Sequence, residues 1–149
     1  MPSRNLLKYY TKEYFLSANE GYQEFKASGG KVLGENHRKG LLLLNPEEGE
    51  KALDLGCGRG ELVLAFVNKG CNAYGLDYSP DALEICHGIL DKSKIAKDSY
   101  NLVAGDVFDT KLPSESFDKI ACFDVIEHLS KEEQLRLNAE IYRLLKPGG

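Results

Sequence analysis

The sequence predicts an α/β fold, a three-layer, Rossmann-like, doubly wound sheet of mostly parallel strands with helices on both faces. From residue 51 onward, short apolar segments alternate with segments of helical periodicity. The first apolar segment runs into a glycine-rich turn, and the next three are each followed by an aspartate. Strand–helix alternation is typical of βαβ units, whose strands are parallel and whose crossovers are right-handed. Ligands of such sheets bind at the carboxyl ends of the strands.

Length and composition fit one soluble domain. The chain has 149 residues, of which 42% are hydrophobic and 28% charged, and this excludes wholesale disorder. The net charge of −4 disfavours a dedicated nucleic-acid binder. No segment approaches the roughly 20 apolar residues of a membrane span, and the first residues lack a signal peptide. We therefore expect no membrane partner and a cytoplasmic location, where the four widely spaced cysteines are reduced thiols.

Residues 1–45 are expected to form a helical extension, and residues 46–149 the core. The extension holds six of the 14 aromatic residues, and residues 1–40 carry a net charge of +3. Tyr10 and Tyr14 are spaced for one helix face, as are Tyr22 and Phe25. A further helix is predicted over residues 35–44, before Pro46.

The core begins with a predicted strand over 51–55, followed by a helix over 61–69 that ends at Gly70. A second strand covers 71–76. Ser79 is a natural N-cap and Pro80 suits the first helical position, so a helix runs from there to about residue 90.

A third strand is predicted over 101–104 and a fourth over 117–123. Residues 130–133 form a capping box that opens a helix reaching about residue 145. Strands two, three and four thus lead into Asp77, Asp106 and Asp124.

The turn after the first strand, Asp54 to Gly60, reads D-x-G-x-G-x-G. Its glycines permit a sharp turn and a close ligand, and the next helix offers unpaired N–H groups. Asp77, at the end of the next strand, is placed to accept both hydroxyls of a ribose. A tight turn without a ligand and a solvated Asp77 are the alternatives. Dinucleotide enzymes have G-x-G-x-x-G instead, and Asp54 would repel a pyrophosphate but suit an ammonium group.

The core resembles the class I S-adenosylmethionine-dependent methyltransferases, of the type 11 and type 12 groups, over residues 51–149. The segments that carry the resemblance are Ala52 to Gly60, Gly75 to Ser79, Gly105 to Val107, Phe117 to Ile120 and Leu144 to Gly149.

The resemblance implies S-adenosylmethionine as cofactor and a role for each strand end. Asp54 would hold the methionine part together with Gly56, Cys57, Gly58 and Gly60. The other implied cofactor contacts are Asp77 on the ribose, Tyr78, Asp106 and Val107 on the adenine, Phe123 and Asp124 near the sulfonium, and Tyr14 and Tyr22 from an extension that closes as a lid.

The same resemblance implies a sheet of seven strands, whereas this sequence predicts four, in the order 3-2-1-4. The chain stops at Gly149, where the fifth strand of the family begins. We therefore expect a chain that lacks the C-terminal strands. Its fourth strand would have an uncovered edge, which favours pairing with a second chain.

Asp124, Glu127 and His128 are the candidate catalytic residues. The segment from Asp124 to His128 resembles the E-x-x-E-H segment of ubiquinone-pathway and small-RNA methyltransferases, where it can contribute metal ligands, but it begins with Asp. A base or a structural role is favoured over a metal site. His37 and His87 carry little weight in the sequence, and a position of His37 and Arg38 facing the cofactor cleft is the less favoured interpretation.

The sequence thus predicts methyl transfer to an O, N or C acceptor, with a small molecule favoured over nucleic acid. Two other hypotheses stay open: an NAD-type Rossmann oxidoreductase, and a domain that binds S-adenosylmethionine without catalysis. These hypotheses concern the family, and they do not decide whether the 149 residues transfer a methyl group on their own.

Overall fold

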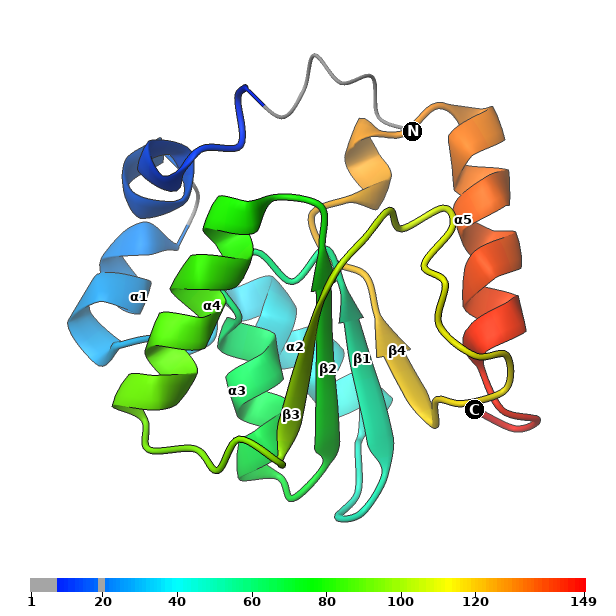
Figure 1. Cartoon of the computed structure of the whole chain (residues 1–149), viewed down its shortest axis with the longest axis horizontal. Coiled ribbons are helices and arrows are strands. Elements are labelled where there is room, and N and C mark those ends of the chain that lie inside the picture. Colours follow the sequence, from blue (N-terminus) through cyan, green and yellow to red (C-terminus); the bar gives the residue numbers. More distant parts are fainter. Residues whose placement is uncertain (1–7, 19–20) are drawn as a thin grey trace.

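The computed structural model describes residues 8–18 and 21–149, so residues 1–7 and 19–20 of the predicted extension lie outside the described residues. Four strands form one sheet in the predicted order, β3-β2-β1-β4 (Figure 1). All three neighbouring pairs are parallel. The strands are β1 (Lys51–Leu55), β2 (Asn72–Asp77), β3 (Tyr100–Ala104) and β4 (Lys119–Ala121).

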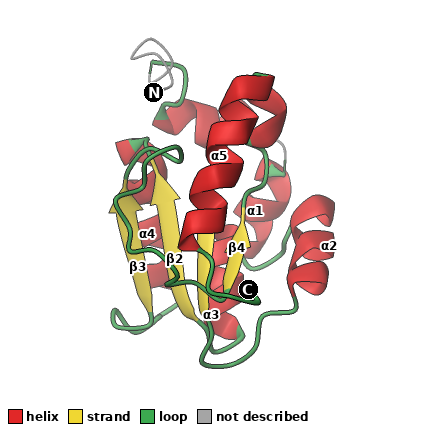
Figure 2. Ribbon diagram, turned by 90° about the vertical axis from the view of Figure 1, so that its right-hand side faces the viewer, coloured by secondary structure: helices red, strands yellow, loops and turns green. Residues whose placement is uncertain are grey.

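Helices cover both faces of the sheet, which confirms the three-layer prediction (Figures 1 and 2). Helices α3 (Glu61–Asn68) and α4 (Pro80–Lys92) pack on one face, and α5 (Lys131–Leu144) packs on the other. The side chains of β1 alternate between these layers: Ala52 lies in the core under α3 and α4, whereas Leu53 and Leu55 lie in the core under α5. This is the period of two that a buried strand requires.

Both predicted helix starts are capped. The Ser79 hydroxyl accepts from the Ala82 N–H at 3.3 Å, and Ser130 and Glu133 form the predicted capping box. β4 is shorter than predicted, because Phe117 leaves the ladder with β1 and forms an isolated parallel bridge with Leu145. Leu145 directly follows α5, so no pattern within residues 117–123 indicates this partner.

The extension consists of a π-helix (Tyr14–Ala18), α1 (Tyr22–Ser28) and α2 (Glu35–Leu44), the last with the predicted bounds. Phe15 and Phe25 are buried in the core that contains α3 and α4. Helix α2 lies beside β4 (Figure 2), where the sequence predicted an uncovered edge. Pairing of that edge with a second chain stays a prediction. Within the described residues, no helix has the length and apolarity to cross a bilayer.

Candidate functional site

A cavity of about 1200 Å³ lies where the carboxyl ends of the four strands face the N-terminal extension. The predicted site residues that line it come from every strand end and from the extension. They are Tyr14, Asp54, Gly56, Cys57, Gly58, Asp77, Tyr78, Asp106, Val107, Phe123, Asp124, Glu127 and His128.

Tyr22 and Gly60 do not line this cavity, and their assignment as cofactor contacts stays a prediction. The Tyr22 ring instead stacks on Phe25, with 6.3 Å between the ring centroids. A methyl group on Gly60 would stand 2.2 Å from the Cys86 sulfur, so this glycine allows α3 and α4 to approach each other. The glycine pattern alone does not distinguish such a packing requirement from ligand contact.

The glycine loop turns sharply over the end of β2. The N–H groups of Gly56 and Cys57 both donate to the Leu76 carbonyl, at 2.7 and 3.0 Å. Gly56, Gly58 and Gly60 all have positive φ, as the turn requires. At Gly58 an added Cβ would meet only Phe15, at 3.7 Å, so the backbone is open to a ligand there.

Asp77 holds the glycine loop in place from the end of β2. One carboxylate oxygen accepts from the Gly58 N–H at 2.9 Å and the other from the Ser79 N–H at 2.9 Å. Burial raises the pKa of Asp77, and the backbone hydrogen bonds oppose this shift. Each carboxylate oxygen has a second lone pair, so the group can order the loop and still accept from a ribose hydroxyl.

Asp54, at the end of β1, is a buried carboxyl without a donor. The residue is only 5% exposed, and no described group donates a hydrogen bond to its side chain. Burial, reinforced by the nearby carboxylates of Asp77, Glu61 and Asp124, raises its pKa to about 8. A buried, unpartnered carboxyl in the wall of a cavity is the group that a cationic ligand would satisfy.

Tyr78 and residues 106–108 also line the cavity. The Tyr78 ring meets Tyr10 edge to face at 5.5 Å, and burial raises the pKa of its hydroxyl. The Asp106 carboxylate accepts from the Phe108 N–H at 2.9 Å, which closes the turn after β3. Aromatic faces beside backbone amides suit a flat heterocycle.

Arg59 ties the glycine loop to the extension, a role that the sequence analysis missed. Its guanidinium pairs with the buried Glu61 at 2.8 Å, donates to the Phe15 carbonyl at 3.2 Å and lies 4.9 Å from the centre of the Phe25 ring. The position is a variable residue of the glycine motif, and its partners are distant in sequence. The only available signal was a charged residue within an otherwise small and apolar turn.

Asp124 lies in the turn after β4, and Glu127 and His128 lie in the 3₁₀ helix Ile126–His128; all three line the cavity. His128 Nε2 lies 3.9 Å from Glu127 Oε1, beyond hydrogen-bond length. His37, from α2, lies closer to an acid: its Nε2 stands 3.3 Å from Asp124 Oδ2. Among the described residues, no three His, Cys, Asp or Glu side chains gather to hold a metal ion.

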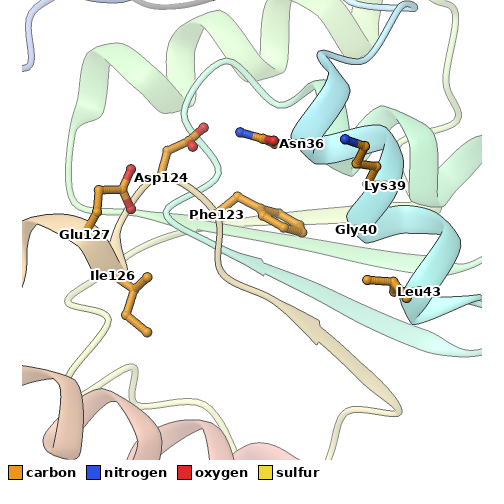
Figure 3. Close-up of a pocket in the computed structure, with 8 residues that line it drawn as sticks. All are labelled: Asn36, Lys39, Gly40, Leu43, Phe123, Asp124, Ile126 and Glu127. Carbon is orange, nitrogen blue, oxygen red and sulfur yellow. The ribbon is translucent and has the colours of Figure 1, made fainter.

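A smaller cavity of about 470 Å³ adjoins the large one between α2 and the turn after β4 (Figure 3). The two share Asn36, Phe123, Asp124 and Glu127. Leu43, Phe123 and Ile126 give the smaller cavity an apolar floor. Gly40 makes room for the Phe123 ring, since a methyl group on it would stand 1.9 Å from Phe123 Cζ.

Comparison with known proteins agrees with this geometry. The chain is 36% identical to a ubiquinone biosynthesis O-methyltransferase from Thiobacillus denitrificans over 104 residues, which is 70% of this chain and 43% of that protein. A second such enzyme, from Methylococcus capsulatus, is 33% identical over 68% of this chain and 41% of its own length. The chain thus spans less than half the length of these curated relatives.

Solved structures show the same fold. A Methanococcus maripaludis protein assigned to the S-adenosyl-L-methionine-dependent methyltransferases superposes with a TM-score of 0.75 at 20% identity, over 94% of this chain and 61% of that one. Phosphoethanolamine N-methyltransferase 2 from Haemonchus contortus, in complex with S-adenosyl-L-methionine, gives a TM-score of 0.62 at 30% identity, over 78% of this chain and 27% of that one.

These likenesses favour the methyltransferase hypothesis over the NAD-type oxidoreductase, and they agree with the G-x-G-x-G spacing of the loop. The methyltransferase domain family matches residues 52–149, which include all four strand ends and the helices α3, α4 and α5. The chain belongs to this family, the S-adenosylmethionine-dependent methyltransferases.

Proposed function

We propose that the large cavity binds S-adenosylmethionine and that the domain directs its methyl group to a hydroxyl of a small-molecule acceptor. The methionine ammonium would lie at Asp54 and the glycine loop, and the ribose at Asp77. The adenine would lie between Tyr78 and the segment Asp106–Val107. The single observation that carries the proposal is Asp54, which is buried in the cavity wall with no hydrogen-bond donor from residues 8–18 and 21–149.

The charge of the ligand explains why an acid stands at this place. A carboxyl that is neutral by burial becomes ionised when a cation binds beside it, and it then forms a charge-assisted hydrogen bond. The glycine loop adds an open approach at Gly58. An anionic pyrophosphate would instead face three neighbouring acids, Asp54, Asp77 and Glu61, in the same wall.

When bound, S-adenosylmethionine supplies an electrophilic methyl group on a sulfonium. The protein then has to hold two reactants in line and exclude water, since positioning alone can lower a barrier by several kcal/mol. The extension covers the cavity at the strand ends. Arg59 holds it there, together with the hydrogen bond that the Ser79 hydroxyl donates to the Tyr10 carbonyl at 2.8 Å.

An oxygen acceptor is favoured by the two O-methyltransferase relatives, and the apolar floor of the adjoining cavity suits a small ring compound. The N-methyltransferase relative keeps an amine acceptor as a second candidate. Binding of the cofactor without catalysis is the remaining alternative for these 149 residues alone.

Calorimetry with S-adenosylhomocysteine and with NAD⁺ tests the cofactor. We expect binding of the first only, and at least about tenfold weaker binding in Asp77→Asn, which corresponds to 1.4 kcal/mol. The exposed Asp98, on the loop before β3, provides a matched control, and Asp98→Asn should bind like the wild type. Binding of NAD⁺ in preference would overturn the proposal. Incubation with labelled S-adenosylmethionine and hydroxyl or amine acceptors then separates catalysis from binding alone.

A further inference from the structure

One contact in the large cavity has no place in cofactor binding. His37, on α2, holds its Nε2 atom 3.3 Å from Oδ2 of Asp124, on the turn after β4. Both residues line the cavity. The contact joins the N-terminal extension to the end of the strand that, by the resemblance, lies nearest the sulfonium.

Packing holds the His37 ring in position. The ring lies 5.3 Å from the centre of the Phe123 ring, and Phe123 is seated against α2 at Gly40. Asp124 has a φ of 56°, a conformation that aspartate adopts more readily than most residues. Val125 next to it packs against Gly56, so the turn is also fixed to the glycine loop.

The other histidines lack this combination. His128 is 61% exposed at its side chain and 3.9 Å from its nearest acid, whereas the His37 side chain is 25% exposed. His87 has a hydrogen-bonded contact, with Nδ1 at 3.2 Å from Asp91 Oδ2, but it lies on the surface of α4 outside the cavity. His37 alone among the three lies against a carboxylate, packs on an aromatic ring and lines the cavity.

We propose that His37, oriented by Asp124, is the general base that takes the proton of a hydroxyl acceptor. The inference rests on the proposed function. Asp124 favours the tautomer with hydrogen on Nε2, which leaves a lone pair on Nδ1. In the step, the O–H bond of the acceptor breaks and an N–H bond forms at Nδ1. The electron pair stays on the oxygen, which becomes the nucleophile, and the imidazolium later releases its proton to water.

The acceptor would enter from the smaller cavity. Figure 3 shows Phe123 and Asp124 on one side of it and α2 on the other, with the Asn36 amide turned toward Asp124. Its apolar floor and polar rim fit a ring compound with a hydroxyl at the end that reaches Asp124. Catechol is therefore a suitable probe, because its hydroxyls are weak acids on a flat apolar ring.

Other charged groups face the same space and enter any pH dependence. They are Asp124 and Glu127 from the turn after β4, His128 and Glu133 beyond it, Tyr14 from the extension, and Glu35 and Arg38 from α2. Asp124 and Glu127 contribute to the raised pKa of Tyr14, after burial and Tyr10. Variants of the histidines, measured side by side, separate the effect of His37 from this common background.

Nitrogen NMR of the imidazoles in the complex with S-adenosylhomocysteine tests the orientation without turnover. We expect His37 to carry its hydrogen on Nε2 and His87 on Nδ1, as their partners Asp124 and Asp91 require. Asp124→Asn should abolish the preference at His37 and leave His87 unchanged. A His37 ring with its hydrogen on Nδ1, or one unaffected by Asp124→Asn, would overturn the proposal.

Methyl transfer from labelled S-adenosylmethionine to catechol tests the role. Loss of a general base lowers rates by about 10²–10⁴-fold, so we expect this loss of kcat in His37→Gln, with wild-type affinity for S-adenosylhomocysteine. His87→Gln is the control and should match the wild type. The inference would be overturned by a wild-type rate in His37→Gln. It would also be overturned if the wild type binds S-adenosylhomocysteine but leaves catechol unmethylated. Absence of S-adenosylhomocysteine binding would instead overturn the proposed function.

Discussion

The substitution Asp54→Asn should make the affinity for S-adenosylhomocysteine insensitive to pH. In the protein without ligand, burial and neighbouring acids raise the pKa of this carboxyl to about 8, so it is mainly protonated at pH 7. An ammonium group beside it favours the ionised form. Binding therefore releases a proton, and affinity should rise with pH below 8.

The size of the effect follows from this linkage. Release of one proton per ligand raises the binding constant about tenfold per pH unit below the pKa, or about 1.4 kcal/mol per unit. Between pH 5.5 and 7 the wild type should thus gain roughly thirtyfold in affinity, while Asp54→Asn stays flat. This window lies below the titration of an α-amino group, at about 7.7–8.0.

Calorimetry in two buffers of different ionisation enthalpy measures both the affinity and the protons released. The structure predicts close to one proton for the wild type at pH 6.5 and none for Asp54→Asn. An affinity of the wild type that does not change with pH would refute the assignment of Asp54 as the ammonium partner.

The same carboxyl affects folding. Its folded pKa of about 8 lies above its usual value of 3.8, so the folded state binds a proton that the unfolded state has lost between these values. The free energy of unfolding should therefore fall as pH rises from about 4 to 8, by up to about 1.4 kcal/mol per unit from this group. Denaturant titrations at several pH values should show the slope reduced in Asp54→Asn.

Four further variants test the glycine loop and its neighbours and one buried ion pair of α5. Gly58→Ala should lower the free energy of unfolding by about 1–2 kcal/mol because of its positive φ, and it should bind S-adenosylhomocysteine at least tenfold more weakly. Gly60→Ala should instead lose cooperative thermal unfolding, because its methyl group would clash with the Cys86 sulfur. Arg59→Ala leaves the buried Glu61 without its cation, so we expect a loss of about 3–5 kcal/mol in denaturant unfolding, and Asp98→Ala should show none. The paired guanidinium of Arg143 lowers the pKa of Glu140 to about 2. The ionised carboxylate therefore stabilises the fold above its usual pKa of 4.5, and this stabilisation disappears as pH falls toward 2. Glu140→Gln should flatten the acid side of the profile of unfolding free energy against pH, and an unchanged acid side would contradict this.

The parts of the site that lie at the ends of the strands were predictable from sequence. Asp54 lies near the end of the first apolar segment, and Asp77 and Asp106 end or follow the next two, and the topology of a parallel sheet brings such positions to one edge. The helix bounds followed equally well where a cap was present, as at Ser79. These features depend on local chain chemistry and on one topological rule.

Contacts between the extension and the core were not predictable in the same way. The spacing of Tyr10 and Tyr14 predicted one helix face, yet Tyr10 lies in a bend before the helix and the two rings meet edge to face at 5.1 Å. Phe117 was assigned to a strand but bridges to Leu145. In each case a tertiary partner outside the segment decided the outcome, and propensity within the segment carries no information about that partner.

The electrostatics of the cavity connect these observations. Asp54 and Asp77 are both buried at its centre with raised pKa values, and Glu61 nearby is balanced by Arg59. Arg59 is in turn occupied by Glu61 and by the Phe15 carbonyl, so its charge holds the extension in place and leaves Asp54 without a cation of the protein's own. A cationic ligand would therefore relieve a cost that folding alone leaves in place. For that reason its stabilising effect on thermal unfolding should be larger at pH 7.5 than at pH 5.5, and a shift in melting temperature that is equal at both would show that the ligand meets no buried carboxyl.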